Sequence, residues 1–118
     1  MTVEQATFPG GMRFVTDRMD SVESVSLGVW VNAGARNETA EINGVSHLLE
    51  HMAFKGTARR SALDIAVEIE NVGGHLNAYT SRESTVYYAT VLKEDAALAL
   101  DIVSDILMNS TFADDELA

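Results

Sequence analysis

Two histidines and a glutamate stand close together near the middle of the chain, at His47, Glu50 and His51. Residues four positions apart lie on one face of a helix, so His47 and His51 could present both imidazoles to a single zinc ion. Glu50 would stand beside that ion without ligating it, where a base can convert a zinc-bound water into a hydroxide nucleophile. The spacing therefore predicts zinc catalysis. The alternative is a helix with two partly exposed histidines and a solvated glutamate.

A catalytic zinc site usually has three protein ligands and one open position. The sequence offers no well-placed third histidine, because the remaining one, His75, follows Gly73 and Gly74 at the expected start of a strand. We expect His75 to be a surface residue and not a ligand. Spacing alone therefore leaves the predicted metal site incomplete.

The composition limits the class of protein that could carry this site. The chain has 118 residues, enough for a single domain with a real core, and 47% of them are hydrophobic. The formal net charge of -10 argues against a nucleic-acid binder and hints weakly at basic peptides as ligands. The chain has no cysteine, which excludes disulfides, thiol catalysis and cysteine-based metal sites.

The sequence also bears on location. It has no apolar run long enough for a membrane helix, and residues 1–9 resemble neither a secretory signal nor a transit peptide. We therefore expect a bacterial cytoplasmic protein, with the mitochondrial matrix as the alternative, and no membrane partner.

Two strands and a loop are expected before the histidine motif. Residues 12–17 and, more regularly, residues 22–32 alternate between apolar and polar side chains, as half-buried strands do. Residues 33–42 are polar and should form a loop. A helix should then begin with Asn43 as its N-cap, carry the motif, and end before Gly56.

A second helix and a pair of strands should follow the motif helix. Ser61 and Asp64 match the capping-box pattern, and the helix that they begin should end before Gly73. Residues 75–80 and 85–92 are then expected as two strands, the second being rich in β-branched and aromatic residues.

A third helix should begin at Glu94 and Asp95 and be followed by a loop at residues 109–113. Asp114 has the pattern of a further N-cap. The predicted order is ββαα-ββα, an α+β fold with a mainly antiparallel sheet packed against helices. Because a helix of one turn is not stable alone, we expect residues 1–118 to be one partial domain, the N-terminal fragment of a longer protein.

Three stretches carry a resemblance to a known family. Residues 47–57 resemble the inverted zinc-binding signature of the insulinase (pitrilysin) family of zinc metallopeptidases, and residues 73–83 and 85–88 resemble further stretches of that family. The likeness runs from Gly11 to the end of the chain and is strongest to bacterial members that are similar to mitochondrial processing peptidase.

The resemblance implies a zinc-dependent endopeptidase in which His47 and His51 ligate zinc and Glu50 is the general base. It further implies that residues 77–79 lie in an edge strand that pairs with extended peptide substrate. Phe54 would line the substrate site, although a phenylalanine at that point of a helix is more often a core residue.

Three residues of the predicted substrate strand are Asn77, Ala78 and Tyr79. For Asn77 the alternative is a residue that satisfies a nearby loop by hydrogen bonding. We interpret Tyr79, like Tyr87 and Tyr88, mainly as a packing residue.

The resemblance places the third zinc ligand, a glutamate, roughly 75 residues after His51 and therefore past Ala118. We expect the fragment by itself to be nearly or wholly inactive. The alternative is a non-catalytic structural or peptide-binding subunit of the same family. The fragment, with its cut edges exposed, could also form a homo-oligomer or a domain-swapped dimer.

Overall fold

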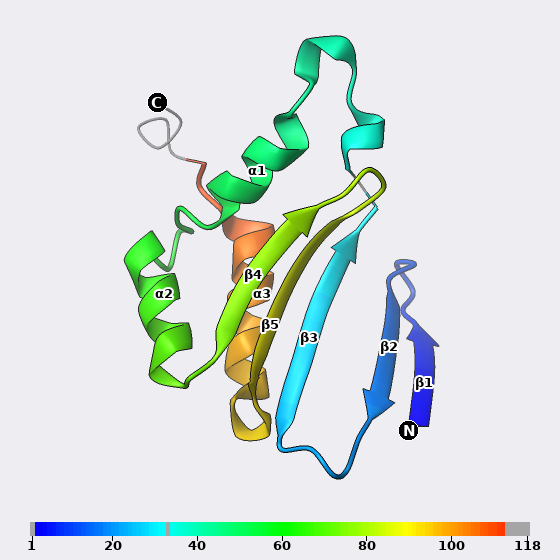
Figure 1. Ribbon diagram of the computed structural model, residues 1–118, viewed down its shortest axis with the longest axis vertical. Helices are drawn as coiled ribbons and strands as arrows, with labels where there is room; N and C mark the ends of the chain where they lie inside the picture. The colour runs from blue at the N-terminus through cyan, green and yellow to red at the C-terminus, as the bar shows by residue number, and fades with distance from the viewer. Residues whose placement is uncertain (1, 33, 113–118) are drawn as a thin grey trace.

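The computed structural model describes residues 2–32 and 34–112 (Figure 1). It begins with a two-stranded antiparallel hairpin of β1, Thr2–Thr7, and β2, Arg13–Arg18. Strand β2 was predicted from the alternation of residues 12–17, whereas β1 was not predicted. The first residues hold few apolar side chains and those of β2 are mostly exposed, so the strand depends on its pairing with β2 and leaves little pattern in the sequence.

The larger sheet has three antiparallel strands in the order β3-β5-β4. Its strands are β3, Ser24–Val31, β4, His75–Thr80, and β5, Thr85–Leu92. The central strand β5 pairs with both neighbours and is the most deeply buried of the three. Strand β4 therefore lies at an edge of this sheet in the part of the chain that the structure describes.

Three helices complete the fold: α1, Val45–Ala53, α2, Ala62–Asn71, and α3, Ala96–Asn109. Helix α3 covers one face of the sheet behind β5, while α1 and α2 lie beside β4 (Figure 1). The core joins all of these elements and includes Ala53, Ile65, Ile69, Ala78, Tyr87, Ala89, Val91, Ala99, Ile102, Val103 and Ile106. The α+β prediction is thus confirmed. None of the described helices is long and apolar enough to cross a membrane.

Short 3-10 turns replace part of the predicted loop before α1 and the predicted start of the third helix at Glu94 and Asp95. Two of them, η1, Ala35–Asn37, and η2, Ala40–Ile42, connect β3 to α1, and a third, η3, Lys93–Asp95, leads into α3. The predicted N-cap at Asp114 lies outside the described residues.

The beginnings of α1 and α2 differ in how well the sequence predicted them. Ser61 and Asp64 form the predicted capping box at α2, each side chain accepting a hydrogen bond from the other residue's backbone. The N-cap predicted for α1 was wrong: Gly44 takes that place instead of Asn43, with a φ of 91° that favours glycine. A glycine has no side chain to cap a helix, so the first amide groups of α1 must find acceptors elsewhere.

The connection between α1 and α2 is held against α3 by a buried carboxylate. Asp105 of α3 has no exposed side-chain surface and accepts hydrogen bonds from Thr57 Oγ1 at 2.7 Å, Arg60 Nη1 at 2.9 Å and Asn109 Nδ2 at 2.9 Å. Burial alone would raise the pKa of Asp105, but these donors hold the pKa well below its usual range. Ser110 adds a hydrogen bond of 3.1 Å to the carbonyl of Ala53, the last residue of α1.

Candidate metal centre

The two motif histidines lie one above the other on the exposed face of α1. Their Nε2 atoms are 3.1 Å apart and their rings meet edge to face, with centroids 4.6 Å apart. Two imidazole nitrogens at the usual bond length from one tetrahedral zinc ion would be separated by about 3.3 Å. The pair His47 and His51 therefore fits a single zinc ion in both donor type and separation.

The glutamate of the motif is held by the sheet. Glu50 is half-buried, and its Oε2 accepts a hydrogen bond of 2.6 Å from Thr80 Oγ1 at the end of β4. Tyr87 of β5 lies below it: burial raises the pKa of the Tyr87 phenol, and the negative charge of Glu50 raises it further. The phenol consequently stays neutral. The Glu50 carboxylate is held by Thr80 on the helix that carries the histidine pair.

A third ligand is not found among the described residues, which contain no group of three His, Cys, Asp or Glu side chains able to hold a metal ion. His75 is exposed at the opposite end of β4 from Thr80, in agreement with the prediction that it is a surface residue. The segment around Asp114, where the sequence suggested a further helix, lies outside the described residues.

The predicted substrate residues lie along β4. Asn77 and Tyr79 are exposed on the outer face of the sheet, where the Tyr79 ring packs 6.1 Å from that of Tyr88, and Ala78 is buried on the inner face. Tyr79 is thus both a packing residue and a half-exposed one. The side chain of Asn77 accepts a hydrogen bond of 2.8 Å from the backbone N–H of Ala78.

Backbone pairing shows which groups of β4 face its open edge. Ser81 N donates to Ser84 O at 2.8 Å, and hydrogen-bonded pairs alternate with non-bonded pairs in an antiparallel ladder. Counting back from that pair, the backbone groups of Ala78 point away from β5. The hydrogen bond from Ala78 to Asn77 agrees with this orientation, so the Ala78 N–H lies on the edge that is unpaired among the described residues.

The sequence model of the insulinase family (Peptidase family M16) matches residues 13–118. The chain belongs to the insulinase family. It is 48% identical over 116 residues to a zinc protease of Streptomyces coelicolor and 49% identical over 115 residues to a zinc protease of Bacillus subtilis, in each case over 98% of this chain. It is also 51% identical over 107 residues, 91% of this chain, to a mitochondrial-processing peptidase beta subunit of Lentinula edodes.

The structure agrees with these relationships. A crystal structure of a protease from Helicobacter pylori superposes with a TM-score of 0.90 at 25% identity over 98% of this chain. The chain spans only part of each relative: 25% and 28% of the two bacterial proteases, 23% of the processing-peptidase subunit and 28% of the Helicobacter pylori chain.

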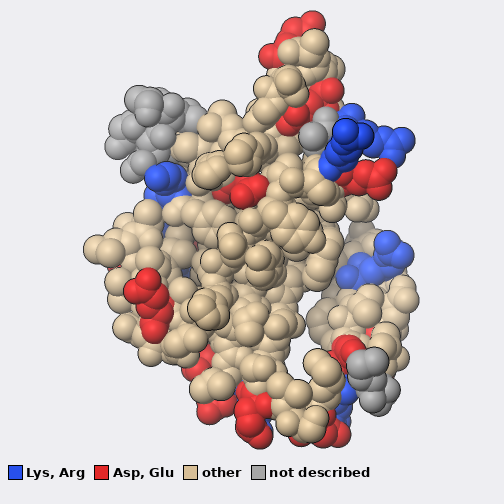
Figure 2. All heavy atoms as spheres, in the orientation of Figure 1, with Lys and Arg blue, Asp and Glu red and all other residues tan. Residues whose placement is uncertain are grey.

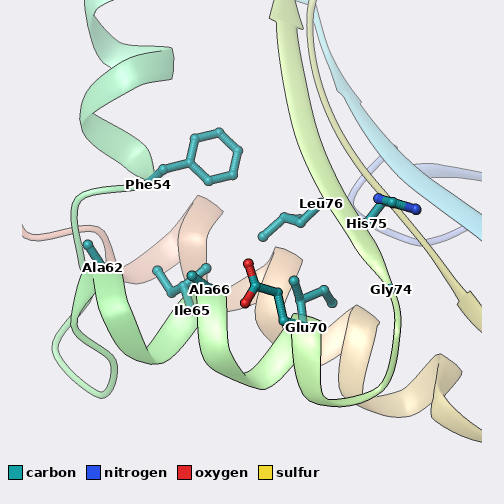
Figure 3. A pocket seen from close by; sticks show the side chains of 9 residues that line it. Phe54, Ala62, Ile65, Ala66, Glu70, Gly74, His75 and Leu76 are labelled. Atoms are coloured by element: carbon teal, nitrogen blue, oxygen red, sulfur yellow. The ribbon is translucent and has the colours of Figure 1, made fainter.

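A groove extends from the end of the motif helix of this insulinase-family chain. It has a volume of about 430 Å³, runs between α2 and the first half of β4, and has Phe54 at one end (Figure 3). Leu76 points into it, the carboxylate of Glu70 faces it, and His75 points away. Phe54 also packs on the core, its ring 6.1 Å from that of Tyr87, as the alternative interpretation of this residue expected.

Two residues that form hydrogen bonds to the motif helix were not predicted from the sequence. Thr80 bonds Glu50, and Glu38 bonds the first amide groups of α1. Alternation along residues 75–80 places Thr80 on the same face as Ala78, but only the packing of α1 against β4 brings Glu50 to it. For Glu38 the signal was the glycine before Val45, which leaves the helix without a side-chain cap.

Proposed function

We propose that this chain carries part of the catalytic centre of a zinc-dependent endopeptidase that cleaves unfolded peptides or small proteins. The observation that carries the proposal is the 3.1 Å separation of the His47 and His51 Nε2 atoms beside the fixed carboxylate of Glu50. The zinc-protease names of the bacterial relatives support it. In this proposal His47 and His51 hold the metal, and a third ligand comes from past Ala118.

A zinc ion held by His47 and His51 together with a third ligand would act as a Lewis acid, which would polarise the peptide carbonyl and make water more acidic. Glu50 acts as the general base: Thr80 fixes its Oε2, and its Oε1 takes the proton of the attacking water. The neutral phenol of Tyr87 does not compete with Glu50 for that proton.

The substrate in this proposal is an extended peptide that pairs with the open edge of β4. The outward backbone groups of Ala78 would bond the peptide main chain, which makes binding tolerant of sequence. Asn77 must then give up its hydrogen bond to the Ala78 N–H. On the face shown in Figure 2, most of the surface carries neither Lys, Arg, Asp nor Glu. Acidic side chains gather toward its top and bottom, and further ones lie on the left side and near the middle. Such a surface suits recognition of the peptide backbone.

Residues 1–118 alone are proposed to be nearly or wholly inactive, because two imidazoles hold zinc more weakly than three ligands. The bacterial relatives suit a bacterial cytoplasmic protein, and the mitochondrial relative suits the matrix alternative.

Calorimetric zinc titration tests the metal site. It compares residues 1–118, the full-length protein that contains them, and the full-length His51→Ala variant. We expect tight binding by the full-length protein, weak binding by residues 1–118 and none by His51→Ala. If the full-length protein binds no better than His51→Ala, the proposal fails and the family's non-catalytic, peptide-binding role takes its place.

The Glu50→Gln variant separates the base from the ligands. Because Glu50 stands beside the histidine pair and is bonded to Thr80, we expect this full-length variant to bind zinc as the parent does. Its peptide hydrolysis should fall by about 10²- to 10⁴-fold. Unchanged hydrolysis would show that Glu50 is not the base.

A further inference from the structure

The first turn of α1 is capped by a carboxylate from outside the helix. Glu38 Oε1 accepts a hydrogen bond of 2.9 Å from the N–H of Gly44, and Glu38 Oε2 accepts one of 2.7 Å from the N–H of Ser46. Gly44 is the N-cap residue, and Ser46 directly precedes His47. One side chain therefore binds two of the amide groups that an uncapped helix leaves without acceptors.

The loop that carries Glu38 is anchored on the turn between β4 and β5. Arg36 N donates to the carbonyl of Arg82 at 2.7 Å, and the Arg36 side chain forms an ion pair of 2.9 Å with Glu83. Gly34 is buried against the same turn, and a Cβ atom at that position would collide with the carbonyl oxygen of Ser81. The position of Glu38 is thus set by the hairpin that contains β4.

The charge of Glu38 suits this place. A carboxylate near the start of a helix is favoured by the helix dipole, and charge-assisted hydrogen bonds are stronger than neutral ones. The backbone hydrogen bonds from Ser46 and Gly44 lower the pKa of Glu38, so the group is charged near neutral pH. Glu38 does not complete the metal site, because the described residues contain no group of three His, Cys, Asp or Glu side chains able to hold a metal ion.

We propose that Glu38 is a positioning residue that fixes the first turn of α1, and with it the His47 imidazole, relative to His51 and β4. The proposal rests on the metal site proposed above. It links the two parts of that site: the anchor of the loop lies at the end of β4, and the bonds of Glu38 lie at the start of the metal-binding helix. The loop that carries Glu38 thereby connects the hairpin of β4 to the helix that carries the two histidines.

Three full-length variants test this role: Glu38→Gln, Glu38→Asp and the control Glu41→Gln. Gln presents an NH₂ group to one of the two amides, and Asp keeps the charge but is too short to reach both. Glu41 belongs to the same loop, and its carboxylate is bonded by Thr39 and its own backbone. Circular dichroism first verifies that each variant is folded.

We expect Glu38→Gln to weaken zinc binding by about 10- to 100-fold, as loss of an outer-sphere support does, and to change the visible spectrum of the cobalt-substituted protein. Glu38→Asp should recover only part of the affinity, and Glu41→Gln should match the parent. The KM for peptide should change less than kcat, because β4 keeps its open edge. If Glu38→Asp restored the full zinc affinity, a carboxylate that reaches only one of the two amides would be sufficient. The requirement for hydrogen bonds to both Gly44 and Ser46 would then be wrong.

Amide hydrogen exchange of the metal-free protein gives a readout that does not depend on the proposed enzyme function. We expect faster exchange at Gly44 and Ser46 in Glu38→Gln than in Glu41→Gln. Equal exchange overturns the role of Glu38 whether or not zinc binds. If the parent binds no zinc but the exchange difference is present, the metal-site proposal fails while the capping by Glu38 stands. If zinc binds tightly and equally to all variants, only the role of Glu38 in positioning His47 fails.

Discussion

Helices α1 and α2 follow one another in the chain and have similar lengths of 9 and 10 residues, but they are stabilised in different ways. Helix α2 begins with its own capping box, in which Ser61 and Asp64 satisfy each other's backbone. Helix α1 begins at a glycine and relies on Glu38 from a preceding loop, and its last turn is bonded by Ser110 from beyond α3.

The difference follows from what each helix carries. The exposed positions of α1 hold the two imidazoles, and its half-buried Glu50 is bonded by a neighbouring strand. Helix α2 carries no part of the proposed metal site and needs only to bury Ile65 and Ile69. A helix that presents reactive groups has to be fixed in orientation, and contacts from several other elements do this better than a local cap.

The largest effect on stability is expected at Asp105, the buried carboxylate that holds the connection between α1 and α2 against α3. Asp105→Asn neutralises the one fully buried carboxylate among the three that bond Arg60, and losing charged hydrogen bonds inside the fold costs about 1.5 to 3 kcal/mol. Chemical denaturation of the full-length protein measures this loss. Asp101→Asn is the control. Asp101 bonds Arg59 and Arg60, which also pair with Asp105, but it is half-exposed, so its effect should be clearly smaller. Equal effects would show that burial of Asp105 is unimportant.

The same variant should also change the response to acid. The pKa of Asp105 is lower in the folded protein than its ordinary value of 3.8, so the carboxylate stabilises the fold above that pH and loses this contribution as the pH falls below it. The parent should therefore lose stability on acidification more steeply than Asp105→Asn in this range. Parallel pH profiles would contradict the assignment.

A smaller effect, on turnover, is expected from the contact between β4 and α1. Thr80→Val keeps the shape of the side chain but removes the hydroxyl that bonds Glu50, and we expect kcat to fall about tenfold with zinc content and KM unchanged. Thr80→Ser should restore most of the rate. Thr90→Val makes the same change at a hydroxyl that bonds Ser26 elsewhere in the sheet, and it should leave kcat unchanged. A similar loss in both valine variants would indicate a general effect on the sheet.

The smallest effect is expected at the local cap of α2. Ser61→Ala should lower the free energy of unfolding by about 1 kcal/mol, because it removes one capping hydrogen bond. Zinc affinity should not change, in contrast to Glu38→Gln. Calorimetric zinc titration compares Ser61→Ala with Glu38→Gln. If Ser61→Ala also weakened zinc binding, the caps of α1 and α2 would not differ in their effect on the metal site.

Much of the fold could be predicted because its signals are local. The strands at 75–80 and 85–92 were predicted with the boundaries that the structure has, since alternation and β-branched residues mark them directly. The capping box at Ser61 was likewise predicted from side chains that act within one turn. By contrast, β1 was missed because its partner, β2, stabilises it.

The sequence by itself determined which residues could do chemistry: the spacing of His47, Glu50 and His51 places them on one helix, and helical periodicity is enough to bring the two imidazoles together. Only the tertiary structure decided how that helix is held. Thr80 meets Glu50, and Glu38 caps the helix, through contacts between elements that are distant from one another in the chain or joined by an irregular loop. Periodicity describes one element at a time, whereas the direction in which a helix faces depends on everything packed around it.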